Sequence, residues 1–233
     1  MAKVKTTKDS AAGLVAFAEP RSAAAEAYRA LRTNIQFASP DKPVHTILAT
    51  STSPDDGKST TIANLAITFA AAGSPTVLID ADLRRPHLHS IFGLSNDTGL
   101  TSLIAEMARN REGITPELPL QNTQVANLQV LTSGPVPPNP AEILGSRRMG
   151  EILDILKLKV EYILIDTPPI IAVTDAAILS PRVDGVLLVV NAGKTRRDLA
   201  VKARDILQQI NANILGVVLN NAEVDKSAYS YYG

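Results

Sequence analysis

One stretch of sequence, residues 44–61, constrains the fold of this chain more than any other feature. An apolar run, Val44–Ala49, is followed by a loop that ends in Gly57-Lys58-Ser59 and then by a stretch with helical periodicity. This order of strand, loop and helix is the context that the phosphate-loop motif G-x-x-x-x-G-K-[ST] requires, although Thr52 replaces its first glycine. Amides at the start of the helix would cradle the phosphates of ATP, Lys58 would reach their oxygens, and Ser59 would bind Mg²⁺. The other loop residues that we expect to contact the nucleotide are Ser53, Pro54, Asp55, Asp56, Gly57 and Thr60.

Two carboxylates in the same loop, Asp55 and Asp56, are unusual next to bound phosphate. Like charges repel, so we expect both side chains to point away from the nucleotide. The alternative is a degenerate loop that no longer binds nucleotide. The joint presence of Gly57, Lys58 and Ser59 between a strand and a helix favours a working loop.

Short apolar runs rich in β-branched residues alternate with helical stretches along the rest of the chain. The predicted strands are Val44–Ala49, Thr76–Ile79, Leu128–Leu131, Tyr162–Ile165, Val186–Val190 and Ile214–Leu219. The predicted helices are Lys58–Ala72, Ala141–Leu156 and Arg196–Ile210. This alternation predicts βαβ crossovers and an α/β fold, with a mostly parallel sheet covered by helices on both faces. We expect one domain over residues 1–220, with an N-terminal helix at about 22–36, and a tail at 221–233.

Acidic residues lie at the carboxyl ends of two predicted strands. Asp80 and Asp82 end the strand after the phosphate-loop helix, and Asp166 ends a later strand. Ligands of parallel sheets bind at this edge, so Asp82 and Asp166 are expected to hold Mg²⁺ together with Ser59. On a continuing strand, Asp80 and Asp82 would face the same side and could share metal and base duties. The alternative is that both are ordinary turn residues.

The composition argues against several classes of function. Lys plus Arg equals Asp plus Glu, at 23 each, so the overall charge gives no reason to expect nucleic acid or an anionic membrane as a partner. Cysteine is absent, which excludes disulfides and thiolate chemistry and suits a reducing compartment such as the cytoplasm. No apolar run approaches the roughly 18 residues that span a bilayer, so we expect any membrane association to need a second protein.

Several motifs together resemble the bacterial tyrosine kinases of capsular and exopolysaccharide biosynthesis, in their stand-alone cytoplasmic form. The similarity covers nearly the whole chain. It rests on Glu26-Ala-Tyr-Arg-Ala-Leu-Arg32, Pro54–Thr61, Leu78–Pro86, Pro137–Glu142, Ile165–Pro169 and Tyr229-Ser-Tyr-Tyr232. The resemblance implies a P-loop fold of the deviant Walker type, related to partitioning-type ATPases, with the matching catalytic positions at Lys58, Ser59, Asp80, Asp82 and Asp166. Two positions depart from the family pattern: Asp55 replaces a small residue, often glycine, and Asn191 stands where the strand often ends in arginine.

Three of the five tyrosines, Tyr229, Tyr231 and Tyr232, lie at the end of the chain. The resemblance implies that these residues are autophosphorylated in trans by a neighbouring subunit. From the residues alone, a solvated tail whose aromatic residues have no function is the favoured interpretation, because short tails are usually disordered ends. The resemblance reverses this preference.

Glu26, Arg29 and Arg32 are spaced i, i+3 and i+6, so they lie on one face of the N-terminal helix. The resemblance implies that this pattern joins subunits into a closed ring, with the acid of one helix meeting the arginines of the next. A pair within one helix, Glu26 with Arg29, explains the same spacing equally well.

Five further residues allow two interpretations each. Asn220 could bind adenine or be a turn residue, and Arg84 and Arg85 could contact phosphate or an incoming tail, or form a solvated basic turn. His87 and His89 have no clear third ligand, so we interpret them as exposed polar residues and expect no metal other than Mg²⁺.

The sequence thus predicts a protein-tyrosine kinase that uses ATP and Mg²⁺, phosphorylates its own tail and regulates polysaccharide synthesis and export. Asp80 would orient or deprotonate the tyrosine, and other tyrosine-containing proteins are possible substrates. The resemblance further implies a transmembrane adaptor that holds the chain at the inner face of the membrane and completes the nucleotide site. One alternative is a partitioning-type ATPase, but such ATPases usually have a second lysine five residues before the catalytic one, where this chain has Ser53. The other alternative is a nucleotide sensor without catalysis, which Asp55 keeps open.

Overall fold

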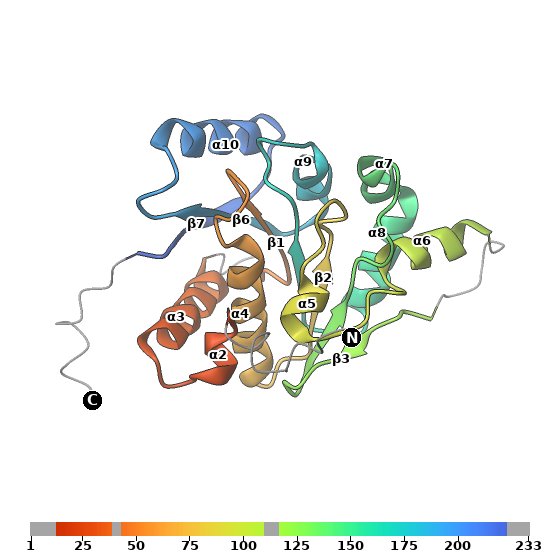
Figure 1. Cartoon of the computed structure of the whole chain (residues 1–233), viewed down its shortest axis with the longest axis horizontal. Coiled ribbons are helices and arrows are strands. Elements are labelled where there is room, and N and C mark those ends of the chain that lie inside the picture. The colour runs from red at the N-terminus through yellow and green to blue at the C-terminus, as the bar shows by residue number, and fades with distance from the viewer. Residues whose placement is uncertain (1–12, 39–42, 110–116, 223–233) are drawn as a thin grey trace, which may run out of the picture.

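The computed structural model describes residues 13–38, 43–109 and 117–222, and its centre is one seven-stranded sheet (Figure 1). The strands are β1 (Thr46–Ser51), β2 (Thr76–Asp80), β3 (Gln121–Asn122), β4 (Leu128–Leu131), β5 (Tyr162–Asp166), β6 (Gly185–Asn191) and β7 (Ile214–Asn220). Their order across the sheet is β3-β4-β2-β5-β1-β6-β7, and every pair is parallel except β3 with β4. The prediction of a mostly parallel sheet is therefore confirmed, and all six predicted strands are present.

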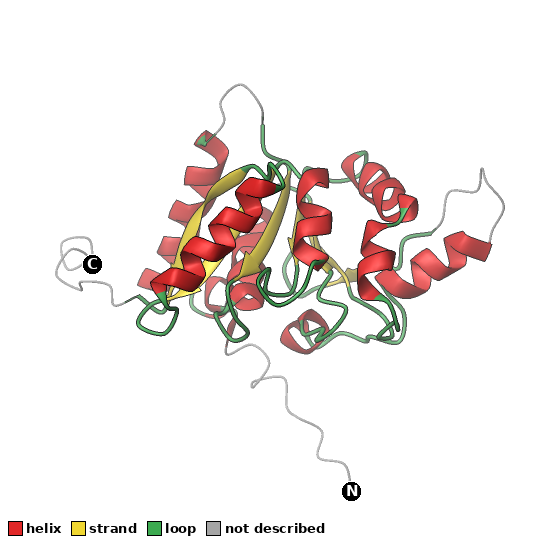
Figure 2. Cartoon of the chain, turned by 90° about the horizontal axis from the view of Figure 1, so that it is seen from above, coloured by secondary structure: helices red, strands yellow, loops and turns green. Residues whose placement is uncertain are grey.

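Helices cover both faces of the sheet, as Figure 2 shows from above. One face carries α2 (Val15–Ala18), α3 (Ala23–Phe37), α4 (Lys58–Ala71) and α5 (Leu88–Phe92), whose apolar side chains form one core cluster with the sheet. The other face carries α6 (Leu100–Arg109), α7 (Pro140–Gly145), α8 (Arg147–Lys157), α9 (Asp175–Leu179) and α10 (Arg197–Gln209), which form a second cluster. Because both faces are covered, the central strands β1, β2, β5 and β6 are buried along their whole length and do not alternate between buried and exposed residues.

Helix α4, which follows the phosphate loop, is the most deeply enclosed helix of the fold. Every residue from Thr61 to Ala70 is buried, because α4 lies between the sheet and α3. Its residues are small or apolar, which lets the helix backbone approach the sheet closely. The start of α4, and with it Lys58 and Ser59, is therefore fixed by the core of the protein.

The predicted helix Ala141–Leu156 is wrong in one respect, since the structure has two helices there, α7 and α8. The chain is extended at Ser146, whose side chain accepts a hydrogen bond from the amide of Met149 and so caps α8. The guanidinium of Arg182 donates to the carbonyls of Leu144, Gly145 and Ser146, which satisfies the end of α7. A capping serine inside an otherwise helical pattern was the signal for this break.

Short elements were also missed by the sequence analysis. Helices α2, α5 and α9 have at most five residues, and α6 lies in a region that was left unassigned. Strand β3 has two residues and is antiparallel to β4, at the edge of the sheet. Across residues 13–38, 43–109 and 117–222, no helix has the length and apolar character needed to cross a bilayer.

Candidate active site

The phosphate loop, residues 52–57, connects β1 to α4 and turns sharply at Gly57. Gly57 has a φ of +88°, a left-handed conformation that glycine adopts without strain. A Cβ atom at this position would also lie 1.9 Å from Nδ2 of Asn220 at the end of β7. That amide nitrogen donates to the carbonyl of Asp56 over 3.0 Å. Asn220 therefore supports the loop backbone directly, whereas its predicted contact with adenine stays a prediction.

The expectation that the Asp56 side chain points outward is wrong. The side chain is buried within the loop. Its carboxylate accepts hydrogen bonds from the Thr52 hydroxyl at 2.6 Å, the Ser53 amide at 2.9 Å and the Thr195 hydroxyl at 2.9 Å. These three donors offset the cost of burying the negative charge. The replacement of the first motif glycine by Thr52 is explained in the same way, because Thr52 supplies one of the donors and has no positive φ.

Asp55 is exposed, which agrees with the expected outward orientation. Its φ is +64°, so the backbone is left-handed here as well, a conformation that glycine adopts without strain. Aspartate is one of the few other residues that tolerate this conformation. The side-chain amide of Asn191, the second departure from the family pattern, contacts the carbonyl of Asp55 at 3.4 Å.

Lys58 and Ser59 meet the acidic residues of two neighbouring strands at the start of α4. The ammonium of Lys58 is 2.9 Å from Oδ2 of Asp82 and 3.5 Å from Oδ1 of Asp166. The Ser59 hydroxyl donates to Oδ2 of Asp166 over 2.5 Å. Asp166 ends β5 and Asp82 lies two residues past the end of β2, and these two strands pair so that Asp80 lies beside Asp166. The structure thus brings together four of the predicted site residues, Lys58, Ser59, Asp82 and Asp166.

Asp80 lies beside this group but contacts different partners. Strand β2 ends at Asp80, so the assumption that Asp80 and Asp82 continue one strand is wrong. Oδ2 of Asp80 accepts the amides of His87 and Leu88, at 3.0 and 2.9 Å, while Oδ1 is buried without a hydrogen bond. Asp80 is fully buried, whereas Asp82 is 5% exposed, so Asp82 is the acid on the solvent side.

The burial of these charges shifts their proton affinities. Burial, together with the nearby charge of Asp166, raises the pKa of Asp80 from 3.8 to about 8, against the opposing effect of the two amides. Burial also raises the pKa of Asp166, although Lys58 and Ser59 favour its ionised form. For Lys58, burial lowers the pKa, but Asp166 and Asp82 more than offset this, so the pKa is raised and the ammonium stays charged. One buried cation thus stands among three acids.

The donor set fits Mg²⁺. Ser59, Asp82 and Asp166 present a hydroxyl and two carboxylates around the Lys58 ammonium, and Oδ1 of Asp166 is buried without a hydrogen bond. In phosphate sites Mg²⁺ is typically held by one or two carboxylates together with phosphate oxygens and water. Within the described ranges, no group of three or more His, Cys, Asp or Glu side chains is arranged to hold an ion without such help.

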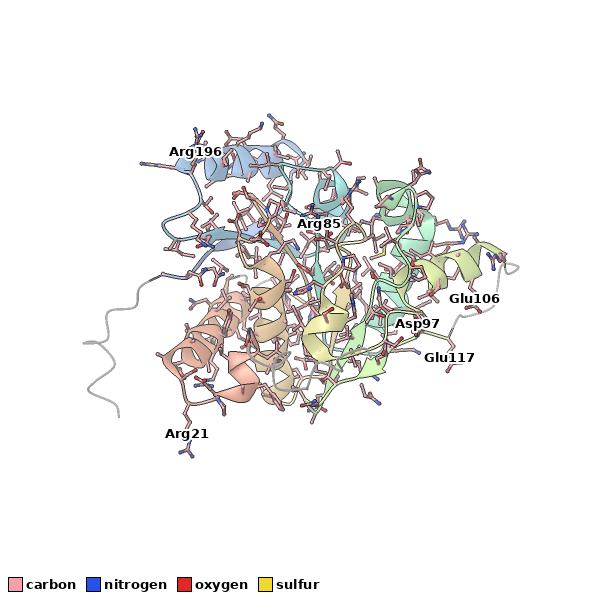
Figure 3. All side chains as sticks on the ribbon, viewed as in Figure 1. Arg21, Arg85, Asp97, Glu106, Glu117 and Arg196 are labelled. Atoms are coloured by element: carbon pink, nitrogen blue, oxygen red, sulfur yellow. The ribbon has the colours of Figure 1, made fainter. Side chains whose placement is uncertain are left out.

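The remaining predicted nucleotide contacts lie at the rim of the loop. Pro54 is exposed, Ser53 is half-buried, and Thr60 is half-buried in the first turn of α4. Arg85 lies in the turn after β2, where Figure 3 labels it, and is exposed, which is compatible with both interpretations that the sequence left open.

Arg84 is exposed like Arg85, with 40% of its side-chain surface accessible, but it is also paired within the chain. Its guanidinium forms two hydrogen bonds with Asp175 at the start of α9, Nε to Oδ2 at 2.9 Å and Nη2 to Oδ1 at 3.0 Å. The sequence analysis missed Asp175, because the two residues are 91 positions apart and no motif joins them.

On α3 of the single chain, Glu26 pairs with Arg29 of the same helix, as one of the two alternatives proposed. Arg29 donates to Oε2 of Glu26 at 2.7 Å and to the carbonyl of Pro20 at 2.8 Å. Arg32 instead donates to the carbonyl of Thr68 on α4 over 2.7 Å. The predicted contacts between subunits stay a prediction.

Comparison with known proteins identifies the family. The family model described as "ParA: NUBPL iron-transfer P-loop NTPase" matches residues 43–229. The tyrosine-protein kinase YwqD of Bacillus subtilis (strain 168) is 43% identical over 221 residues, which are 94% of this chain and 91% of that protein. The chain belongs to the bacterial tyrosine kinases of the P-loop NTPase fold.

Two solved structures agree with this family. The chimerical protein CapA2B2 has a TM-score of 0.85 and 39% identity, with 91% of each chain covered. The kinase domain of the Escherichia coli tyrosine kinase ETK has a TM-score of 0.81 and 33% identity, over 91% of this chain and 82% of that one. The resemblance inferred from sequence motifs is therefore confirmed, together with the P-loop fold.

We predict that replacing the Asp80 carboxylate changes how stability depends on pH. The pKa of Asp80 is about 8 in the folded chain and near 3.8 when it is exposed. Between these values the folded state binds more protons than the unfolded state, so stability falls as pH rises through this window. In urea titrations of the protein free of nucleotide and metal, Asp80→Asn should therefore lose less stability than wild type between about pH 5 and pH 8.

A matched control for this prediction is Asp154→Asn, which changes an exposed carboxylate on α8. Its pH dependence should follow wild type. An Asp80→Asn variant with the same pH dependence as wild type would show that Asp80 is ionised throughout.

Proposed function

We propose that this chain transfers the γ-phosphate of ATP to tyrosines Tyr229, Tyr231 and Tyr232 of a neighbouring subunit, and thereby regulates capsular or exopolysaccharide synthesis and export. The observation that carries the proposal is the buried cluster of Lys58, Ser59, Asp82 and Asp166 behind a phosphate loop. The tail lies outside the described residues, so its role rests on the sequence and on the family.

In this mechanism the chain positions and neutralises the reacting phosphates. The ammonium of Lys58 moves from Asp82 to the β- and γ-phosphate oxygens, while the amides at the start of α4 hold the phosphates from the other side. Ser59, Asp82 and Asp166 would hold Mg²⁺, which would supply further neutralisation of the phosphate charge. Because Lys58 leaves Asp82, the acidic cluster opens on its solvent side, where the tyrosine enters.

The transfer step forms one bond and breaks one. The phenolic oxygen attacks the γ-phosphorus, and the bond between that phosphorus and the β,γ-bridging oxygen breaks, which releases ADP. The phenolic proton passes to the ionised form of Asp80, whose pKa of about 8 lies closer to that of a tyrosine hydroxyl than the pKa of an exposed carboxylate does, so the step requires a pH at which Asp80 has lost its own proton. Oδ1 of Asp80 has no hydrogen-bond donor and is the oxygen available to take this proton.

The two tyrosines outside the tail are poor acceptors in the folded chain. Tyr162 is only 6% exposed and packs against Phe69, with ring centroids 4.1 Å apart. Tyr28 is partly buried on α3, and burial raises the pKa of its hydroxyl. The raised pKa makes the Tyr28 hydroxyl harder to deprotonate, and the burial of Tyr162 keeps its hydroxyl from bound nucleotide, so neither residue is suited to attack phosphate.

We predict that tail phosphorylation passes between subunits. Two variants are produced together in the native host, which supplies any membrane partner: Lys58→Met with an intact tail, and a variant with phenylalanine at all three tail tyrosines. The first lacks the lysine that neutralises the phosphates, and the second has no acceptor. Phosphotyrosine mass spectrometry should therefore find tail phosphate when both are present and none when either is produced alone.

Two outcomes would contradict the proposal. Phosphotyrosine on the Lys58→Met tail in the absence of the other variant would show that another enzyme adds the phosphate. ATP hydrolysis by the purified chain, with no phosphotyrosine when both variants are present, would favour a partitioning-type ATPase.

We further propose that Glu26, Arg29 and Arg32 join subunits into a ring. In the single chain, Glu26 and Arg29 lie at the surface with side-chain exposures of 54% and 36%, so both can exchange their mutual contact for one between subunits. Arg32 is already bound to Thr68, and its role in a ring would be to hold α3 in place. A closed head-to-tail ring would bring each tail to the site of its neighbour.

We predict that charge reversal on α3 dissociates the ring. Glu26→Arg and Arg29→Glu each place like charges at the subunit contact, so each should lower the mass measured by size-exclusion chromatography with light scattering. The swap of both residues in one chain restores opposite charges and should restore the mass. Arg147→Glu, at an exposed ion pair on α8, is the control and should leave the mass unchanged. Equal masses for all four variants and the wild type would contradict a ring through α3.

The chain is proposed to act on the inner face of the membrane through a separate transmembrane adaptor. Family membership supports this proposal, and the described residues contain no helix that could cross a bilayer by itself.

A further inference from the structure

Among the ion pairs of residues 13–38, 43–109 and 117–222, the pair of Arg84 and Asp175 is the most enclosed outside the cluster around Lys58, although 40% of the Arg84 side chain stays exposed. The Asp175 side chain has no exposed surface, and both of its oxygens accept hydrogen bonds from the Arg84 guanidinium. Two parallel hydrogen bonds fix the orientation of the guanidinium relative to the carboxylate as well as the distance between them. By comparison, the pairs Arg147–Glu151 and Arg196–Asp198 are exposed on both sides.

The pair connects the segments that follow the two acid-bearing strands. Arg84 comes two residues after Asp82, in the turn that leaves β2, and Asp175 lies nine residues after Asp166, at the start of α9. Strands β2 and β5 are neighbours in the sheet, with Asp80 paired to Asp166. The ion pair is therefore a second link between the two chain segments, beyond the point where the sheet ends.

Asp82 needs this link because it lies past the last residue of its strand. The sheet fixes Asp166, which ends β5, but β2 ends at Asp80. Asp82 is oriented by its turn, in which Oδ1 accepts the amide of Arg85 at 3.0 Å and Oδ2 contacts Lys58. Arg84 is the residue between Asp82 and Arg85 whose side chain ties this turn to α9.

We propose that Arg84 and Asp175 are positioning residues that hold Asp82 at the correct separation from Asp166, and so set the affinity of the nucleotide site for Mg²⁺. This inference rests on the proposed binding of Mg²⁺ by Asp82, Asp166 and Ser59. It assigns Arg84 a role other than contact with phosphate or with an incoming tail, the two roles that its sequence position suggested. Substitution of residues that orient metal ligands typically lowers metal affinity about 10- to 100-fold.

The test measures ADP binding and needs no phosphate transfer. A fluorescent ADP analogue is titrated into the full-length wild type and into Asp175→Asn, Arg84→Gln and the double variant, over a series of Mg²⁺ concentrations. We expect each single variant to raise the Mg²⁺ concentration for half-maximal binding about tenfold, and the double variant to match the singles. Binding without Mg²⁺ should change less than twofold.

Thermal unfolding of each variant separates positioning from loss of fold. A variant that unfolds at a lower temperature but keeps the wild-type dependence on Mg²⁺ would overturn the inference, because the pair would then be structural only. If Arg84→Gln weakens binding without Mg²⁺ while Asp175→Asn does not, Arg84 contacts phosphate and the inference is also overturned.

Two controls complete the experiment. Arg147→Gln with Glu151→Gln removes an exposed ion pair on α8 and should leave the Mg²⁺ dependence unchanged. Wild-type binding with no dependence on Mg²⁺ would contradict the proposed metal site itself, which distinguishes that failure from a failure of the positioning pair.

Discussion

The burial of three carboxylates beside one lysine is the constraint on which the rest of the site depends. Asp80 and Asp166 have no exposed surface and Asp82 has very little, so each carboxyl group, ionised or protonated, needs a partner inside the protein. Lys58 forms ion pairs with Asp82 and Asp166, and the Ser59 hydroxyl donates a hydrogen bond to Asp166. Two backbone amides donate hydrogen bonds to Asp80. Phosphate and Mg²⁺ would bind these same groups. The residues that bind the nucleotide are therefore also the residues that balance the buried charge.

The phosphate loop is held by residues from distant parts of the chain. Asn220 at the end of β7 and Thr195 after β6 both reach the loop, through the carbonyl and the carboxylate of Asp56. A carboxylate that would repel phosphate becomes part of the support of the loop once its charge is satisfied by three donors. Residues that follow β6 and end β7 therefore help to hold the loop that follows β1.

Local patterns in the sequence predicted the sheet, the phosphate loop and the residues around Lys58, because these depend on runs of apolar residues and on motifs within a few positions. The break at Ser146, the inward turn of Asp56 and the pairing of Arg84 with Asp175 were not predicted. The pairing of Arg84 depends on Asp175, 91 positions along the chain, and the buried position of Asp56 depends in part on Thr195. The break at Ser146 did have a local signal, the capping serine, within an otherwise helical pattern. The spacing of Glu26 and Arg29 was compatible with contacts within or between subunits, and a single chain shows only the first.

The central claim is that Lys58 balances charges that Mg²⁺ can also balance, and thermal unfolding tests it most directly. Wild type and Lys58→Met are compared near pH 8 without nucleotide, over increasing Mg²⁺ concentrations. Removal of one partner from a buried ion pair costs about 3–5 kcal/mol, so Lys58→Met should unfold at a lower temperature without Mg²⁺. It should then gain more stability from Mg²⁺ than wild type, since no ammonium competes for the carboxylates. Equal unfolding temperatures and equal gains from Mg²⁺ would contradict the claim.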